Sequence, residues 1–223
     1  MKLNTYAVQI TCPNCNKKST YTIHSLIDTT LDKNAEQKLF SGTLFTYTCP
    51  FCKEEIDLSH SCMYHDGSKQ LLIALADNKT DEEEMILRLN GNYHENELDE
   101  VLHDWVQNCK RRIVSTPNQL QEKVLISHFN LDDHIIEIAK QFTKDIASEQ
   151  EPTLNIDELL FNHNQEGYSF VIFDEEGVVG ETPFSKDTYL MLEKKYGSKI
   201  EDNSLFVDEE WAKDFLRRTT VLS

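Results

Sequence analysis

A five-residue phrase, Thr-Cys-Pro-x-Cys, occurs twice in the chain, at residues 11–15 and again at residues 48–52. Each Cys-x-x-Cys turn can aim two sulfurs at one point, and two such turns supply the four soft ligands that a tetrahedral zinc ion requires. The proline after the first cysteine fixes φ and reduces the entropy lost when the turn becomes ordered. A complete set of thiolates leaves no open position for a substrate. We therefore predict one structural zinc ion per chain, bound by Cys12, Cys15, Cys49 and Cys52.

The residue that follows the second cysteine in such a turn often has a left-handed backbone. Asn16 tolerates that conformation, whereas Lys53 is a poorer choice. The 33 residues between the two pairs exceed the roughly 15–20 of many zinc sites. An inserted helix, capped by Asp32 or Asn34 and ending at Gly42, accounts for the excess.

The first 76 residues are expected to form a small antiparallel sheet with this one inserted helix. Residues 21–23 and 43–47 alternate as half-buried strands do, and a third strand is predicted from 56 to 64. An Asp-Gly pair at 66–67 predicts a hairpin into the apolar run 70–75, because the tight turn needs positive φ.

Residues 77–148 are expected to be an acidic, helical region. The acidic run at 81–84 is predicted to be a solvated segment, and an amphipathic helix is predicted at 98–106. Thr116 begins a capping-box sequence, and Asp132 can cap the helix after it. That last helix is predicted to place five apolar residues inside: Ile135, Ile138, Ala139, Phe142 and Ile146.

After a linker at 148–152, the rest of the chain is expected to mix strands and helices. Two β-rich runs flank the turn at 174–177 and predict a hairpin, while Ser185 and Asp208 can each cap a helix. The predicted fold class is α+β. It consists of a zinc-ribbon-like antiparallel sheet with an inserted helix (1–76), a helical region (77–148) and a mixed α+β region (153–223).

The formal charge of −17 is unevenly distributed. Residues 1–76 are neutral, residues 77–110 carry −7 and the remaining residues carry −10. Such a chain repels a phosphate backbone, so nucleic-acid binding is disfavoured. The N-terminus has no apolar signal segment, and no apolar run reaches the ~18 residues of a membrane helix. We expect a cytoplasmic protein whose six cysteines serve metal or redox chemistry rather than disulfides.

The two cysteine motifs resemble those of the CpXC family of bacterial and archaeal proteins. Four further segments are similar to that family: residues 38–42, 44–50, 64–66 and 130–137. The resemblance covers residues 8–140 and implies a zinc-ribbon-like domain, without implying a particular activity. Asn16 and Lys53 depart from the pattern, because such turns commonly have glycine there. This departure concerns the turn geometry and not the ligands.

Two other functions stay open on the residues alone. One is an enzyme with a site between the ribbon and the helical half, using His60, His65 or Cys62; the same three residues suggest a second metal site. The other is a thiol oxidoreductase with redox-active Cys-x-x-Cys pairs. The sequence has no P-loop, dinucleotide fingerprint or zinc-deaminase signature. We favour a protein-interaction module with a still unknown protein partner; the role of Cys109 and the oligomeric state are not predicted.

Overall fold

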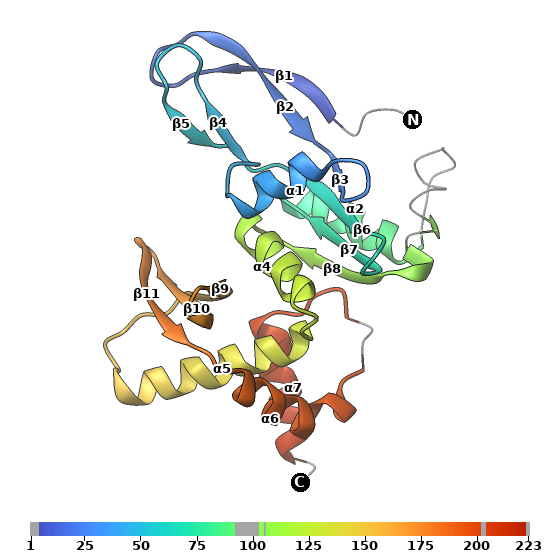
Figure 1. The fold of residues 1–223 in the computed structure, drawn as a ribbon, viewed down its shortest axis with the longest axis vertical. Helices are drawn as coiled ribbons and strands as arrows, with labels where there is room; N and C mark the ends of the chain where they lie inside the picture. The colour runs from blue at the N-terminus through green and yellow to red at the C-terminus, as the bar shows by residue number, and fades with distance from the viewer. Residues whose placement is uncertain (1–4, 92–102, 105, 202–203, 222–223) are drawn as a thin grey trace. The chain divides into compact units, whose positions relative to one another are not determined.

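The computed structural model describes residues 5–91, 103–104, 106–201 and 204–221. The chain divides into two compact units, residues 1–121 and 122–223, whose elements are labelled in Figure 1. The three regions predicted from the sequence, 1–76, 77–148 and 153–223, stay a prediction. Both units contain helices and sheets, which confirms the predicted α+β class.

Two hairpins carry the two cysteine pairs, each pair lying in the turn that joins two strands. Both hairpins are antiparallel: β1 (Thr5–Thr11) pairs with β2 (Lys18–His24), and β4 (Thr46–Thr48) pairs with β5 (Glu55–Asp57). Between the hairpins in the sequence lies α1 (Lys33–Phe40). The Asp32 carboxylate accepts a hydrogen bond from the Ala35 N–H at 3.0 Å, which confirms the predicted cap of the inserted helix.

The larger sheet of the first unit has four strands in the order β3-β6-β7-β8. These strands are β3 (Leu26–Asp28), β6 (Cys62–Asp66), β7 (Leu71–Leu75) and β8 (Lys110–Val114). β3 pairs with β6 and β7 pairs with β8 in parallel, whereas β6 and β7 form an antiparallel hairpin. Every residue of β7 is buried, as expected for a central strand covered on both faces. The sheet is therefore mixed, and not purely antiparallel as predicted.

Two further predictions for this region need correction. The strand predicted at 56–64 is two strands, β5 and β6, which belong to different sheets. The hairpin after Asp66 is confirmed, but the residue with positive φ, 49°, is Gln70 and not Gly67. The Asp66 carboxylate supports the turn by accepting a hydrogen bond from the Ser68 N–H at 2.9 Å.

Helices of the first unit begin with side-chain caps. Asn78 caps α2 (Lys79–Leu89), so the acidic run predicted to be a solvated segment is helical. Two of its acids, Asp81 and Glu82, lie in the first turn, where the helix dipole favours negative charge. Thr116 caps α4 (Pro117–His128) as predicted, and the unit boundary falls inside this helix. The predicted helix at 98–106 lies mostly outside the described residues.

The second unit contains a three-stranded antiparallel sheet in the order β11-β10-β9, together with helices. In chain order its elements are α5 (Asp133–Gln150), β9 (Glu158–Asn164), β10 (Gly167–Asp174), β11 (Gly177–Pro183), α6 (Lys186–Tyr196), the 3-10 turn η1 (Gly197–Lys199) and α7 (Glu209–Val221). The β10–β11 hairpin is confirmed, and so are the three predicted caps, Asp132, Ser185 and Asp208. Strand β9 was missed.

One face of β9 and β10 contributes to the core of the second unit. Phe161 lies opposite Phe170 across the two strands, and both are buried with Ile135 of α5 and Phe215 of α7. Each large apolar side chain that is buried stabilises the fold by about 1.5–3 kcal/mol. Ile146 was predicted to lie inside with them, but it is 53% exposed.

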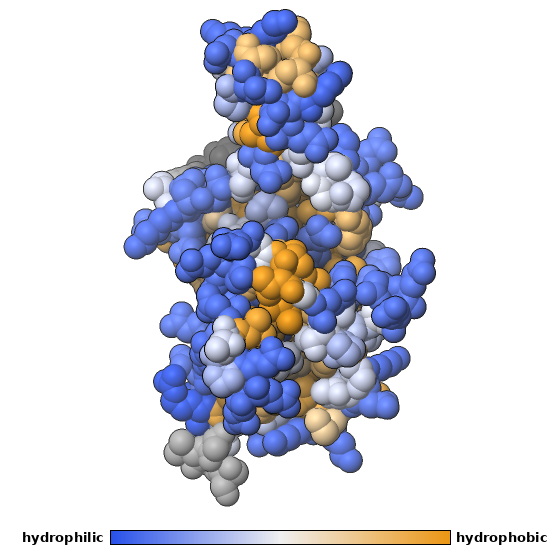
Figure 2. Space-filling model, turned by 90° about the vertical axis from the view of Figure 1, so that its left-hand side faces the viewer, coloured by the Kyte–Doolittle hydropathy of each residue, from blue (hydrophilic) through white to orange (hydrophobic). Residues whose placement is uncertain are grey.

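The face drawn in Figure 2 is mostly hydrophilic, with its most strongly apolar patch near the middle of the view and a further apolar area near the top. On β11 of the second unit, Val178 and Val179 are 65% and 45% exposed. Among the described residues, no helix is both long and apolar enough to cross a membrane.

Candidate metal centre

The two cysteine turns have the same backbone geometry. The Asn16 N–H donates to the Cys12 carbonyl at 2.9 Å, and the Lys53 N–H donates to the Cys49 carbonyl at 3.0 Å. The N–H groups of Cys12 and Cys49 in turn donate to the carbonyls five residues later, at 3.0 and 2.8 Å. Asn16 and Lys53 have φ of 56° and 64°. The left-handed position predicted after each second cysteine is therefore confirmed.

The structure brings together the four cysteines that the sequence singled out. Their sulfurs all lie within 4.8 Å of one another. The sulfurs of Cys12 and Cys52 are 3.6 Å apart, and those of Cys15 and Cys49 are 3.7 Å apart. Four sulfurs bound at about 2.3 Å to one tetrahedral ion lie about 3.8 Å apart, whereas a disulfide joins sulfurs at about 2.05 Å. The observed spacing fits the ligands of a single metal ion.

The pKa values of Cys49 and Cys52 are shifted in opposite directions. Burial by itself raises the pKa of Cys49, but the amides of Cys52 and Phe51 and the side chains of Cys52 and Tyr47 donate to its sulfur and lower the pKa to about 6. The amide of Glu54 acts to lower the pKa of Cys52, but burial and the neighbouring cysteines outweigh it and raise the pKa to about 12. A divalent cation bound at this point would take the place of the thiol protons.

Tyr47 is a supporting residue that the sequence analysis missed. Its hydroxyl contacts the Ser19 hydroxyl and the Cys49 sulfur. The bond with Ser19 lowers the pKa of Tyr47, but burial and the Cys49 sulfur outweigh it and raise the pKa. The hydroxyl therefore keeps its proton and can donate it to a ligand sulfur, as outer-shell groups of metal sites do. Strand alternation is the signal that places Tyr47 on the same face as Cys49.

The second metal site suggested by His60, His65 and Cys62 is not formed. The Cys62 thiol is buried, which raises its pKa to about 12 and makes it inert. His65 Nδ1 lies 2.8 Å from the Asp28 carboxylate. His60 precedes β6 and bonds elsewhere, to the Leu58 carbonyl. These three residues therefore serve separate parts of the first unit.

A cavity of about 330 Å³ lies in the first unit, between ribbon residues such as Phe45 and Asp57 and the first turns of α4. Asp57 is the one ionisable side chain among the residues that line it. Neither His60 nor Cys62 reaches its wall. The cavity can accept a small group, but its lining lacks the pair of titratable residues that acid–base catalysis requires.

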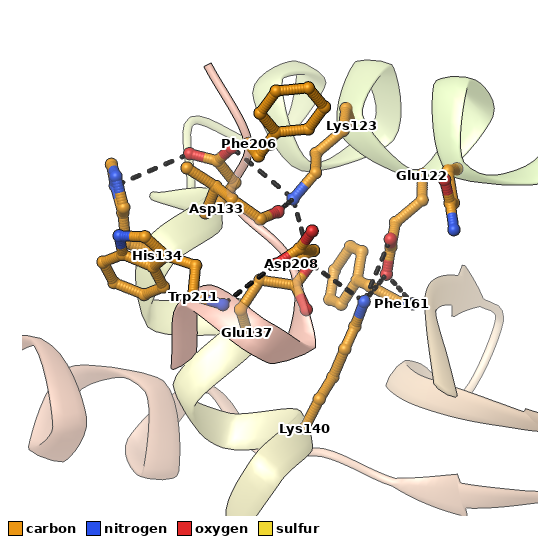
Figure 3. A network of polar contacts seen from close by, with 12 residues as sticks. Glu122, Lys123, Asp133, His134, Glu137, Lys140, Phe161, Phe206, Asp208 and Trp211 are labelled. Atoms are coloured by element: carbon orange, nitrogen blue, oxygen red, sulfur yellow. Dashed lines mark hydrogen bonds and ion pairs between the residues drawn. The ribbon is translucent and has the colours of Figure 1, made fainter. Parts of the chain in front are cut away.

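The second unit buries a network of charged side chains, shown in Figure 3. Lys140 Nζ lies 3.0 Å from Glu122 Oε2 and 2.9 Å from Glu137 Oε1. Lys123 Nζ lies 2.9 Å from Glu137 Oε1 and donates to the Val207 carbonyl at 2.6 Å. Burial by itself lowers the pKa of Lys140, but the two glutamates outweigh it and raise the pKa. Lys140 is thus held charged between its two partners, and the network links α4 to α5.

Asp132, Asp133 and His134 are another group whose potential ligand atoms lie within 4.8 Å of one another. Asp132 Oδ1 accepts from the His134 N–H at 2.9 Å and lies 2.8 Å from His134 Nδ1. Lys123 Nζ lies 3.6 Å from Asp133 Oδ2. Cationic or N–H partners therefore already face these carboxylates. The group is the cap and first turn of α5, as predicted.

Comparison with known proteins supports the resemblance seen in the sequence. Residues 10–140 match the family model described as CpXC protein. No curated protein and no solved structure matches the chain. The matched segment contains all four cysteines and the whole four-stranded sheet. Because it spans more than half of the 223 residues, the chain belongs to the CpXC family.

Proposed function

We propose that Cys12, Cys15, Cys49 and Cys52 bind one zinc ion that stabilises the N-terminal unit, and that the protein acts by binding a partner protein. The spacing of the four sulfurs carries this proposal, because it fits the edges of a tetrahedron around one ion. Thiolates select zinc, copper(I) or iron–sulfur clusters, and a closed set of four cysteines around one ion is typical of structural zinc.

The small size of the surrounding core supports a structural role for the ion. A two-stranded hairpin alone is marginally stable in water. The apolar residues packed around the sulfurs are few: Ile10, Tyr21, Tyr47, Ile56 and Leu58. Structural zinc supplies about 10–16 kcal/mol to small zinc domains at neutral pH. The ion is therefore the main source of stability for the two hairpins.

A binding role is favoured over catalysis by the environment of the ionisable groups. Cys62 is inaccessible, His65 is held by Asp28, and the cavity offers Asp57 alone. The charge of −17 favours a partner with a basic surface, because opposite charges steer association, and it disfavours nucleic acid. The six cysteines are free thiols, which suits the reducing cytoplasm.

A thiol oxidoreductase is the second candidate, and the pKa of about 6 at Cys49 favours it. A low pKa makes a cysteine a good nucleophile only where a disulfide substrate can reach the sulfur. Cys49 is 0% exposed, so its sulfur is shielded by the turn. A thiolate is also the form that a metal ion requires. The same low pKa therefore fits zinc binding better than redox exchange.

Metal content and thiol count on one sample of purified protein test the proposal. We expect one zinc per chain and slow thiol reaction at the four ligand cysteines. The Cys12→Ser variant should lose the ion and the structure of the first unit, because site formation and folding are coupled. Cys62→Ser is the matched control: it removes a buried thiol outside the site and should keep the zinc.

The outcomes separate the two candidates. No metal, ready titration of the four thiols in the Cys-x-x-Cys pairs and reduction of insulin disulfides that is lost in Cys12→Ser would establish the oxidoreductase instead. The partner half of the proposal is tested by affinity purification with zinc-loaded protein. We expect the zinc-loaded wild type to recover a binding protein that the Cys12→Ser variant does not recover. Turnover of a small molecule without any such partner contradicts the binding role.

A further inference from the structure

The sheet of the second unit carries apolar side chains on both of its faces. Phe170 of β10 belongs to the core of the unit, and Ile172 packs against that core. Because the side chains of a strand alternate between the two faces, Val171 and Phe173 lie on the opposite, outer face. Neither of them belongs to that core or packs against it. An antiparallel sheet commonly presents a polar outer face to solvent, so these apolar residues are an exception.

A β-bulge at the end of the β10–β11 hairpin brings two valines opposite Phe173. Phe173 pairs with Val178, but the preceding residue, Ile172, pairs with Gly180. Val179 is therefore the extra residue of the bulge. β11 is the outer strand of its sheet, and a bulge makes such an edge a poor template for a further strand. We therefore expect a partner at β11 to bind through side chains.

The outer face becomes more exposed toward the turn of the hairpin. Leu160, which lies opposite Val171, is 7% exposed, whereas Val171 and Phe173 are partly buried. Val178 and Val179 are 65% and 45% exposed. The name hairpin patch is used below for Val171, Phe173, Val178 and Val179.

The strands around the hairpin patch carry acidic side chains and no lysine or arginine. Residues 158–183 contain six aspartates and glutamates in total. Asp174 Oδ1 holds the turn by accepting from the N–H groups of Glu176 and Gly177, at 2.8 and 3.1 Å. The side chains of Glu175 and Glu176 are exposed in the same turn. The hairpin patch therefore lies in a region of negative potential.

We propose that the hairpin patch is a docking surface for a basic protein, one that presents apolar side chains flanked by lysines or arginines. The exposed valines supply an apolar centre and the acids of the turn supply a charged rim, as in many protein–protein interfaces. The carboxylates attract the basic rim of the partner and steer its approach. This surface belongs to the second unit, so it goes beyond the proposed function and does not require the zinc ion.

The charge of the sheet argues against other occupants of this surface. In a twofold dimer the same surface meets itself, so both sides would carry the same excess of carboxylates. Nucleic acids and anionic membranes present phosphates, which the acids repel. A protein with a basic rim is the occupant whose charge complements the hairpin patch.

A peptide of defined sequence tests the proposal on the zinc-loaded, full-length protein. The probe is a synthetic peptide in which tryptophan and leucine alternate with lysine. Two comparison peptides replace the lysines by glutamates or the apolar residues by serines. We expect the probe alone to shift the amide NMR signals of β10 and β11. Added salt should weaken its binding, because exposed charges are screened.

Val178→Thr/Val179→Thr removes apolar surface but keeps β-branched side chains, which suit a strand. This double variant should bind the probe about 10-fold more weakly or worse. Leu190→Gln/Met191→Gln is the matched control, because these two residues of α6 are 47% and 60% exposed and lie outside the hairpin. The control should bind the probe as the wild type does.

Glu175→Gln/Glu176→Gln removes two charges of the turn, so it should lower both the affinity for the probe and its dependence on salt. Glu82→Gln/Glu83→Gln, in α2 of the first unit, changes the net charge equally on an element that contributes nothing to the hairpin patch. This control should bind the probe as the wild type does. If both double variants weakened binding alike, a general attraction of lysine to an acidic chain would explain it, and the proposal would be overturned.

Cys12→Ser separates this proposal from the proposed function. The first unit of that variant is expected to lose its structure, but the second unit has its own core, so the variant should still bind the probe. The docking surface is overturned if the probe leaves β10 and β11 unchanged, if the valine variant binds as tightly as the wild type, or if Cys12→Ser no longer binds. Failure of the proposed function shows instead as wild-type protein without zinc or without a recovered partner.

Discussion

In the two cysteine turns, Lys53 is the residue whose side chain is least suited to its backbone conformation. Its φ is 64°, and a side chain in that region costs roughly 1–2 kcal/mol. Lys53→Gly should therefore raise the free energy of unfolding by about 1 kcal/mol, after the entropy cost of glycine is subtracted. Urea titration of the zinc-loaded protein measures the change.

Lys18→Gly is the control for the Lys53 substitution. It removes another lysine close to the cysteines, but from an extended position in β2, where glycine should cost about 0.5–1 kcal/mol. Equal losses of stability in the two variants would mean that the lost charge, and not the backbone strain, decides the effect.

Asp28 couples the stability of the first unit to pH. Burial by itself raises the pKa of Asp28, but hydrogen bonds from Thr30 and His65 outweigh it and lower the pKa. A carboxyl whose pKa is lower in the folded state stabilises the fold above its unfolded pKa of about 3.9, and this contribution is lost as the pH falls through the folded value. Asp28→Asn should lower stability at pH 7 by about 1–3 kcal/mol.

Urea titrations from pH 7 to pH 3 measure this contribution. The wild type should lose stability at the acid end more steeply than Asp28→Asn, so that the two curves converge. Glu175→Gln, at an exposed turn of the second unit, should run parallel to the wild type. If the stability curves of Asp28→Asn and the wild type ran parallel from pH 7 to pH 3, Asp28 would not be the cause of the acid sensitivity.

At the scale of the elements, the predictions that succeeded rest on local chemistry. The caps of α1, α5 and α7 and the left-handed residues of the two turns depend on side chains within a few positions, which the sequence displays directly. Cys-x-x-Cys spacing likewise singled out the four cysteines that the fold brings together, without knowledge of the sheet.

The missed elements depend on distant partners. β3 pairs in parallel with β6, and β7 with β8, across long stretches of chain, and short apolar runs carry no information on such register. The predicted strand at 56–64 ignored the break between β5 and β6 for the same reason.

The buried ion pairs join helices α4 and α5, so breaking one of them should lower the stability of the second unit. Lys140→Met leaves Glu122 without its ammonium partner and Glu137 with Lys123 alone. Breaking a buried ion pair in this way should cost about 3–5 kcal/mol. The double variant Glu122→Gln/Lys140→Met should recover part of that loss, because it removes the uncompensated charge. Urea unfolding measures all three proteins.

Lys144→Met provides the control one turn further along α5. Lys144 pairs with Glu209, whose side chain is 39% exposed, and such a partly solvated pair contributes about 0–1 kcal/mol. If Lys140→Met costs no more than Lys144→Met, the buried network does not hold the two helices together.

In the whole molecule, the segment that matches the family and the first folding unit end at different residues. The match stops at Lys140, in the middle of α5. Ile135 and Ile136, in the first half of that helix, are fully buried in a core that Phe170 and Phe215 help to form. The first half of α5 therefore depends for its burial on residues beyond the matched segment. Residues 141–223 belong to the same folding unit as the last residues of that segment.

The two units are expected to respond differently to loss of the metal. In the proposed function the first unit depends on a metal ion at the four cysteines, whereas the second unit has its own apolar core and buried ion pairs. A strong chelator with a reducing agent should therefore abolish amide-exchange protection in β1, β2, β4 and β5 and leave protection in α5 and β10. Cys12→Ser should give this pattern without chelator, and Cys62→Ser should not. Uniform loss of protection would instead mean that the chain unfolds as one cooperative body, despite the division after Gln121.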